Sequence, residues 1–487
     1  MSEAASSKSS RNKVYAAGVV AFLAILSLLY YMSAPVYLYI VVYMWFGFTY
    51  GVLQQYGRFC FASAWRDLIM IKVPRMFVGI MIGLMTLSII SAWLFTKYPD
   101  FYHATPLGPH ELVGGLLFGL GMVLAGGCAT GSLYKTGEGN MISLIVLLAL
   151  SFSQAIFVSL PFFDPVMNKL VFMTDSAFKW PQITLEEKVF SIPEGQHGTF
   201  LQNLFANSFI NTILVGSILL IAVYLIVVRK GFLKRRTQEI AATAAADGGE
   251  VRMGFKDEAA GFWSMITASR RTTIAAVLLG IVAAFQVFSM NWMREQYDFK
   301  NFGQVMTGKT TSGAPPPESW PKQAMPDEAS QKGTMFDPGY WYITTQEAMF
   351  AGWAIDEGSN NSINMTGNSY FGQTNGIPKP WHSPALLLSF GLILGAAVLA
   401  LVNKEFKWKL PNRELFLYAL IGGTIMGIGS RIALGCNIGA FYTRAAFGNP
   451  GGWIFFIGMG LGALVSAMFI NWWANRKMAK LDFDIEL

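Results

Sequence analysis

The chain has few charged residues, and this scarcity excludes a soluble fold. Asp, Glu, Lys and Arg make up 13% of its 487 residues, whereas hydrophobic residues make up 53%. Soluble proteins carry charge on about a quarter of their residues. The apolar residues gather in runs of about 20, long enough to cross the hydrocarbon of a membrane as a helix. The composition therefore predicts an all-α polytopic membrane protein that lies in a lipid bilayer.

Cysteine is also scarce, and the three residues present, Cys60, Cys128 and Cys436, lie in or beside apolar runs. An odd number without a Cys-x-x-Cys pair does not predict a disulfide framework. The four histidines fall in predicted external loops, away from the cysteines in sequence, so we expect no zinc site and no other cofactor. These histidines are His103, His110, His197 and His382. The 24 methionines are scattered through the apolar runs, which favours gap-filling over a soft-metal site.

Three further absences narrow the function. No Asp or Glu lies in the middle of an apolar run, so neither a carboxylate proton relay nor a cation site is expected at the membrane midplane. No Gly-x-x-x-x-Gly-Lys-[Ser/Thr] phosphate-binding loop occurs, so coupling to ATP would need a partner. Apart from Arg431 and the boundary residue Arg75, the basic residues behind the net charge of +7 lie between the apolar runs, which gives no reason to expect a nucleic-acid partner.

Ten apolar spans are expected. They lie at 14–32, 36–56, 75–95, 112–130, 141–162, 207–228, 272–290, 384–402, 414–434 and 452–473. Placing the N-terminus in the cytoplasm puts most of the 36 Lys and Arg residues on the cytoplasmic side, as the positive-inside rule requires. We therefore expect a protein of the bacterial inner membrane with both termini in the cytoplasm.

The spans and the loops between them predict an organisation in two membrane repeats. The parts are membrane repeat 1 (1–163), an external loop (164–206), the first part of membrane repeat 2 (207–228 and 272–290), a cytoplasmic linker (229–271), an external cap (291–383) and the second part of membrane repeat 2 (384–487). The cap is rich in Pro, Gly, Asn and Trp. It offers a surface for a periplasmic or membrane partner.

One segment occurs twice. Residues 114–134 (GGLLFGLGMVLAGGCATGSLY) and 422–442 (GGTIMGIGSRIALGCNIGAFY) align without a gap at an offset of 308. The identical pairs are Gly114/Gly422, Gly115/Gly423, Gly119/Gly427, Gly121/Gly429, Ala125/Ala433, Gly127/Gly435, Cys128/Cys436, Gly131/Gly439 and Tyr134/Tyr442. The two copies lie five spans apart and must therefore be antiparallel. We predict two inverted five-span repeats, a frequent transporter architecture.

Each copy concentrates glycine around its cysteine. The residues are Gly126, Gly127 and Gly131 around Cys128, and Gly435, Asn437 and Gly439 around Cys436. Glycine costs about 1 kcal/mol per residue in a helix interior, and unwound backbone at membrane depth occurs only where protein buries it or where it lines a cavity. We predict a broken helix at each cysteine, with free N–H groups facing a bound anion. Close helix packing through the glycines is the alternative.

The third cysteine stands in GRFCFASAWRD (57–67), at the cytoplasmic end of the second span. Aligning residues 51–61 with 280–290 places Ser289 opposite Cys60. On this alignment Cys60 has no partner, and one end of the pathway differs chemically from the other. A lone buried cysteine is usually a small hydrophobe, but two at equivalent breaks favour a functional set of three.

Cations near the cysteines favour an anionic ligand. Arg431 precedes Cys436 by five residues, Arg444 follows it by eight, and Arg58 precedes Cys60 by two. Each of these side chains could instead reach to the membrane surface or lie in a loop.

These motifs together resemble the YeeE/YedE family of sulfur-transport membrane proteins, whose characterised members take up thiosulfate. The resemblance rests on GRFCFASAWRD (57–67), GGCATG (126–131) and GCNIG (435–439), in this order and with the internal repeat. It implies an inverted-repeat fold in which short broken helices meet at mid-membrane. It also implies that Cys60, Cys128 and Cys436 handle thiosulfate in turn through weak S–H···S hydrogen bonds.

The leading hypothesis is a non-enzymatic transporter or channel that passes thiosulfate, or a related sulfur-containing anion, along a cysteine-lined pathway. Three alternatives stay open. The first is a membrane sulfurtransferase that forms a persulfide on a reactive thiolate. The second is a transporter of selenium compounds. The third is an accessory subunit of a larger membrane complex, assembled through the cap at 291–383.

Overall fold

The computed structural model describes residues 2–102, 108–161, 209–247, 254–308, 310–321, 337–360, 362, 363, 365, 371, 377 and 379–485. Within these ranges the chain forms helices and no strand, apart from one isolated bridge between Asn140 and Lys409. The predicted loop at 164–206 and two of the histidines, His103 and His197, lie outside the described residues.

The all-helical membrane class is confirmed. Ten helical segments of the described chain are long and apolar enough to cross a membrane, and each corresponds to one predicted span. The α-helices are α1 (Ser2–Ser33), α2 (Leu38–Gly57), α3 (Phe61–Met70), α4 (Arg75–Lys97), α5 (Pro109–Leu124), α6 (Ala129–Gly137), α7 (Met141–Val158), α11 (Phe209–Val223), α12 (Arg229–Asp247), α13 (Phe255–Thr267), α14 (Arg270–Gln296), α15 (Phe302–Thr307), α17 (Thr344–Gly358), α19 (Pro384–Val402), α20 (Arg413–Ile432), α21 (Thr443–Ala446) and α22 (Gly451–Ile485). Short 3₁₀ segments are η1 (Pro35–Tyr37), η2 (Pro99–Phe101) and η4 (Pro380–His382), and π-helical segments are η3 (Tyr224–Val228) and η5 (Asn437–Tyr442).

The two helices that carry the repeat, α5 and α20, pack against each other in opposite directions. A Cβ added to Gly114 would meet Ala433, and a Cβ added to Gly422 would meet Ala125. Adding 308 to the numbers of Gly114 and Ala125 gives Gly422 and Ala433, so each contact is the image of the other. The two copies therefore face each other across a local two-fold axis.

Other pairs of packed helices are also related by the repeat, since each pair has an equivalent pair in which the two copies change places. Helix α5 packs against α22 and α20 packs against α7, while α2 packs against α19 and α14 packs against α4. The peripheral helices follow the same rule, because α1 packs against α19 and α11 packs against α4. These equivalent pairs agree with an inverted repeat. The division of the whole chain into two five-span repeats stays a prediction.

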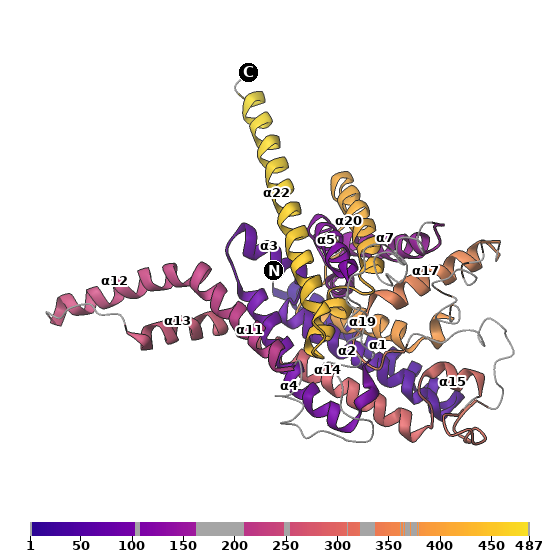
Figure 1. Ribbon diagram of the computed structural model, residues 1–487. Helices are drawn as coiled ribbons and strands as arrows, with labels where there is room; N and C mark the ends of the chain where they lie inside the picture. Colours follow the sequence, from indigo (N-terminus) through magenta and orange to yellow (C-terminus); the bar gives the residue numbers. More distant parts are fainter. Residues whose placement is uncertain are drawn as a thin grey trace, which may run out of the picture.

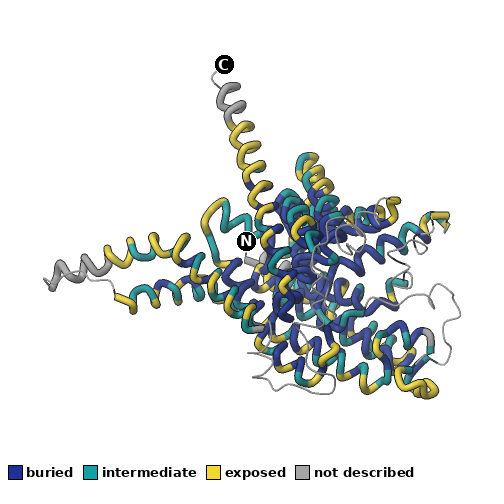
Figure 2. The backbone as a smooth tube through the Cα atoms, viewed as in Figure 1, coloured by how far each residue is buried: buried dark blue, intermediate teal, exposed yellow. Residues whose placement is uncertain are grey.

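Two parts project from the helical core (Figure 1). Helices α12 and α13 form a hairpin over the predicted linker at 229–271, held by a 2.6 Å ion pair between Arg229 and Glu258. The C-terminal half of α22 extends away from the core on another side. Figure 2 shows exposed residues along both projections and buried residues along the central helices.

The loop predicted as an external cap, 291–383, returns in part to the helical core. Trp341 is fully buried, and its ring stacks on Tyr50 of α2 with centroids 4.3 Å apart. The short helix α17 follows directly and packs against α7 and α19. This stretch of the loop is therefore part of the core.

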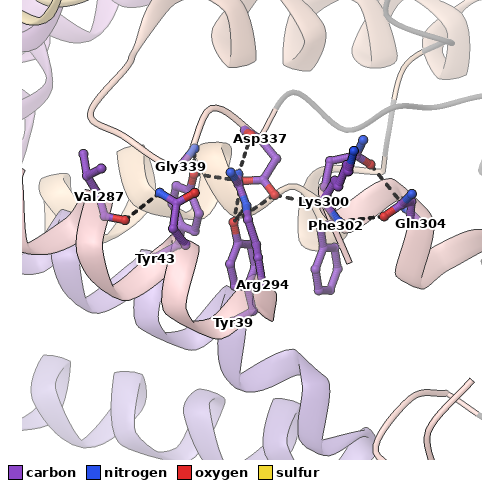
Figure 3. A network of polar contacts seen from close by, with 11 residues as sticks. Tyr39, Tyr43, Val287, Arg294, Lys300, Phe302, Gln304, Asp337 and Gly339 are labelled. Atoms are coloured by element: carbon purple, nitrogen blue, oxygen red, sulfur yellow. Dashed lines mark hydrogen bonds and ion pairs between the residues drawn. The ribbon is translucent and has the colours of Figure 1, made fainter. Parts of the chain in front are cut away.

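A buried polar network fixes the chain just before Trp341 (Figure 3). Asp337 forms a 3.0 Å ion pair with Arg294 of α14 and accepts hydrogen bonds from the hydroxyls of Tyr39 and Tyr43 of α2. The Asp337 side chain is fully buried. A buried carboxylate that is paired and hydrogen-bonded in this way resists displacement, because removing one partner leaves an uncompensated charge.

Candidate functional site

The helix breaks at the first Gly-Cys motif, as the glycines predict. Helix α5 ends at Leu124 and α6 begins at Ala129. Gly126 occupies the left-handed region at φ +69°, which is strained for residues with a Cβ. Cys128 is extended and caps α6, with the Gly131 N–H donating to its sulfur at 3.2 Å.

Cys60 lies beside Cys128, with the two sulfur atoms 3.9 Å apart. Gly131 makes this approach feasible, because a Cβ there would lie 2.6 Å from the sulfur of Cys60. The sequence places Cys60 at the cytoplasmic end of the pathway as a separate, unpaired residue. The structure instead joins it to the first break as one half of a thiol pair.

Both thiols lie at helix N-termini. Cys60 is the N-cap residue of α3 but makes no side-chain capping hydrogen bond, and the N–H groups of Ser63 and Cys128 act on its sulfur electrostatically. The sulfur of Cys128 accepts a hydrogen bond from the Gly131 N–H at 3.2 Å. Helix N-termini attract anions through free N–H groups and the helix dipole. The first break thus presents two soft sulfur atoms and two converging N-termini.

The second Gly-Cys motif breaks its helix in the same way. Helix α20 ends at Ile432, and Leu434 takes the left-handed position that Gly126 has in the first copy, at φ +54°. Cys436 is extended, and the π-helical segment η5 follows it. Its sulfur makes no side-chain capping hydrogen bond, but the N–H groups of Ile438 and Gly439 and the Thr344 side chain act on it electrostatically. Single π-turns of this kind are rare and occur often at functional sites.

Tyr342 occupies the place at the second break that Cys60 has at the first. A Cβ on Gly439, the repeat equivalent of Gly131, would lie 2.1 Å from the Tyr342 ring. The Tyr342 hydroxyl donates to the carbonyl of Leu434. Ser289, which the sequence alignment sets opposite Cys60, lies instead inside α14. At the second break, the counterpart of Cys60 is therefore Tyr342, which belongs to the 291–383 loop.

A buried cation stands beside the second break. Arg431 is 1% exposed, and its Nη atoms donate to the hydroxyls of Thr344 and Thr345 at 3.3 Å. Glu347 of α17 is also buried, and neither carboxylate oxygen has a hydrogen-bond partner. Arg431 acts on this carboxylate electrostatically, but burial has the larger effect and raises the pKa of Glu347 to about 8.

Several buried polar groups in the same region have no hydrogen-bond partner. Asn437, predicted as a site residue, is fully buried with both amide atoms unpartnered. The others near the breaks are the hydroxyls of Thr130, Ser132 and Tyr442 and the indole N–H of Trp341. Buried polar groups are normally hydrogen-bonded, so an unpartnered group indicates a missing ligand, ion or water.

Aromatic side chains connect the two breaks. Phe61, next to Cys60, meets the ring of Tyr442 edge-on at 6.1 Å. Trp341 meets Tyr442 at 6.0 Å and stacks on Tyr50. Cys436 has no contact within hydrogen-bonding range of either other thiol, all three being described residues. The thiols therefore form a pair and a single residue, with an aromatic layer between them.

Arg58 is half exposed and already paired. Its Nη atoms bind Glu138 at 2.7 Å and Glu405 at 2.8 Å. Burial raises the pKa of Glu138, and Arg58 opposes that rise. Near the same break the ammonium of Lys135 donates to the carbonyl of Gly126 at 2.8 Å. Arg58 thus adjoins the thiol pair but is held by two carboxylates.

Two sequence expectations need correction. His110 was expected in an external loop, but it lies in the first turn of α5 and is fully buried. Arg444 was expected to favour an anionic ligand, but it forms a buried 2.9 Å ion pair with Glu111. Sequence reasoning also missed Glu347, since α17 falls outside every apolar run. Its signal was local: an aromatic stretch, GYWYI, directly before a helix-compatible segment.

The glycines predicted as site residues lie at the two helix breaks. Gly127 and Gly435 lie in the two turns, and a Cβ there would meet Ser132 and Tyr342 at 3.0 and 2.6 Å. Among the described residues no group of three or more His, Cys, Asp or Glu side chains could hold a metal ion.

Comparison with known proteins gives relatives along most of the chain. The thiosulfate transporter TsuA of Spirochaeta thermophila is 25% identical over 405 residues, which cover 82% of this chain and 88% of the relative. TsuA of Escherichia coli is 24% identical over 436 residues, covering 88% of this chain and 94% of the relative. The probable transporter YedE of E. coli is 39% identical over 98 residues, or 20% of this chain and 24% of the relative.

A sequence profile of the family described as sulphur transport matches residues 56–465. The match contains all three cysteines, both broken helices and α17. It therefore covers the site as well as most of the helical core. The chain belongs to the sulphur transport family.

Proposed function

We propose that this protein carries thiosulfate, or a closely related sulfur-containing anion, across the bacterial inner membrane. One observation supports this most strongly. Two thiols lie 3.9 Å apart where two helix N-termini converge, in a chain whose relatives along most of its length are named thiosulfate transporters. Both relatives share only about a quarter of their residues with it, so the substrate is part of the proposal.

The chemistry of the thiol pair suits thiosulfate. Thiosulfate is a dianion with a soft terminal sulfur and a hard sulfonate end. A thiol is a weak donor and a polarizable acceptor, so it binds the terminal sulfur without holding it too tightly to leave. The N–H groups at the N-termini of α3 and α6 offset part of the cost of desolvating the sulfonate.

The pathway that we propose runs from Cys436 to the Cys60–Cys128 pair. With the N-terminus in the cytoplasm, α17 and the second break approach from outside, and Arg58 and Glu138 lie toward the cytoplasm. The anion first meets Arg431, Asn437 and Cys436. It then passes the aromatic layer and reaches the thiol pair.

The protein acts as a transporter without covalent chemistry on this proposal. A sulfurtransferase would need a water-accessible thiolate, whereas all three cysteines are buried. A persulfide detected by mass spectrometry during turnover would favour that rival. The partner predicted for the 291–383 cap stays a prediction, and the burial of Trp341 gives part of that loop a role inside the core.

Uptake by purified protein in liposomes tests the substrate. Radiolabelled thiosulfate should accumulate in protein-containing vesicles, and unlabelled thiosulfate should compete strongly. Selenium analogues should compete less well, and sulfate, which lacks the soft sulfur, should compete weakly. Competition by sulfate equal to that by thiosulfate would contradict a thiol-based pathway. No uptake of any sulfur anion would contradict the proposed function.

A further inference from the structure

Glu347 is the one buried carboxylate beside the cysteine breaks that has no hydrogen bond in the described chain. It lies on α17, whose first residue, Thr344, accepts a hydrogen bond from Arg431 at 3.3 Å. Both Thr344 and the Glu347 charge act electrostatically on the Cys436 thiol. Glu347 therefore lies near the point at which the proposed pathway begins.

Among the described residues, the positive charge of Arg431 acts on Glu347, and Glu347 acts in turn on the Cys436 thiol. Helices α7 and α19, which pack against α17, contain no Asp, Glu, Lys, Arg or His. An ionised carboxylate here would be desolvated, unpaired by hydrogen bonds and close to a passing dianion, and like charges at short range in a buried site repel strongly.

Protonation of Glu347 replaces this repulsion of the anion by an attraction. A neutral carboxyl group no longer repels the anion and no longer offsets the positive charge of Arg431. It also gains an O–H donor that can reach a sulfonate oxygen. Burial already brings the pKa of Glu347 to about 8, so the group can take up a proton near neutral pH.

We propose that Glu347 is the protonation site that couples uptake of the anion to uptake of a proton. The carboxylate accepts one proton from the external side as the anion binds beside Cys436. It releases that proton toward the cytoplasm after the anion has moved on to the thiol pair. This inference rests on the proposed function and supplies its driving ion.

Liposome uptake at different external pH values tests the coupling. As external pH rises through about 8, the value for Glu347, the wild-type rate should fall, approaching about tenfold per pH unit for one required proton. Glu347→Gln, which mimics the neutral acid, should transport at a rate that does not vary with pH. It should also lose the accumulation driven by an imposed pH gradient. Glu258→Gln, on the projecting hairpin, should behave as wild type.

A second measurement needs no variant of the site. Isothermal titration of wild-type protein with thiosulfate, in buffers of different ionisation enthalpy near pH 9, where most Glu347 carboxyl groups are ionised before binding, should show an uptake that approaches one proton per anion. Zero protons taken up, or a pH response of Glu347→Gln equal to that of wild type, would overturn the inference. Wild-type uptake that is active but independent of pH would overturn it too and leave the proposed function standing. Absence of uptake at every pH would instead contradict the proposed function.

Discussion

The two breaks have the same backbone and different side chains. Each ends a long helix, turns through a left-handed residue and places an extended cysteine at a new helical N-terminus. At the first break a second thiol, Cys60, fills the space over Gly131. At the second break the Tyr342 ring fills the space over Gly439. The shared backbone supplies N–H donors for an anion, so the side chains determine how each break treats it.

Under the proposed function, this difference gives each break its own step. The second break carries a buried guanidinium and a carboxyl group whose pKa burial raises to about 8, so we propose that it captures the anion. The first break carries two thiols and paired cations, so it can hold a soft sulfur and release it. Two identical breaks would not distinguish the end that captures the anion from the end that releases it.

Cross-linking of the thiol pair should have the largest effect. An oxidant such as diamide should join Cys60 to Cys128, with two thiols giving up two electrons and two protons to the diamide. Uptake should fall to background and return after reduction. Tandem mass spectrometry should find this disulfide and an unmodified Cys436. A cross-link from Cys436 to either other cysteine would contradict the separation of the two breaks.

Removal of the buried cation should have the next largest effect. Arg431→Met removes the charge-assisted hydrogen bonds that we propose between the guanidinium and the anion, each worth about 1.5–3 kcal/mol. This loss predicts a roughly ten- to hundredfold rise in the thiosulfate KM. The exposed cation Lys477, paired with Glu414, gives the control Lys477→Met. Equal KM values for the two variants would remove Arg431 from the site.

Glycine replacements should separate close packing from backbone conformation. Gly439→Ala puts a Cβ against the Tyr342 ring, and such overpacking costs about 1–3 kcal/mol. Gly126→Ala meets no atom within 4 Å and suffers only from its positive φ. Thermal unfolding in detergent should therefore show a larger loss of stability for Gly439→Ala. The reverse order would contradict the place given to Tyr342.

Arg58→Ala should have the smallest effect. The side chain is half exposed and held by two carboxylates, and exposed pairs contribute at most about 1 kcal/mol. Uptake should fall a few-fold at low salt, and the difference from wild type should shrink as salt screens the charge. A loss as large as that of Arg431→Met would place the main anion site at the first break.

Much of this architecture follows from the sequence. Runs of about 20 apolar residues predict the ten spans because the bilayer fixes helix length. The glycines around Cys128 and Cys436 predict the breaks because a helix with clustered glycines is unstable. The gapless repeat and the span count predict that the two copies run antiparallel, and the structure shows α5 and α20 packed in opposite directions.

The rest depends on contacts between segments far apart in the chain. Cys60 meets Cys128 across 68 residues, and nothing in the spacing of either motif specifies that contact. Glu347 and Tyr342 lie in a loop whose polar composition predicts an external cap. They reach the site because Trp341 and the network around Asp337 hold that loop in the core.

The central claim is that cysteines at both breaks handle one anion. Initial rates of radiolabelled thiosulfate uptake into liposomes test it directly in Cys128→Ala and Cys436→Ala, with Ser289→Ala as the control and protein amounts matched. The account predicts severe loss of uptake in both cysteine variants and wild-type uptake in the control. Unchanged uptake in both cysteine variants would contradict it.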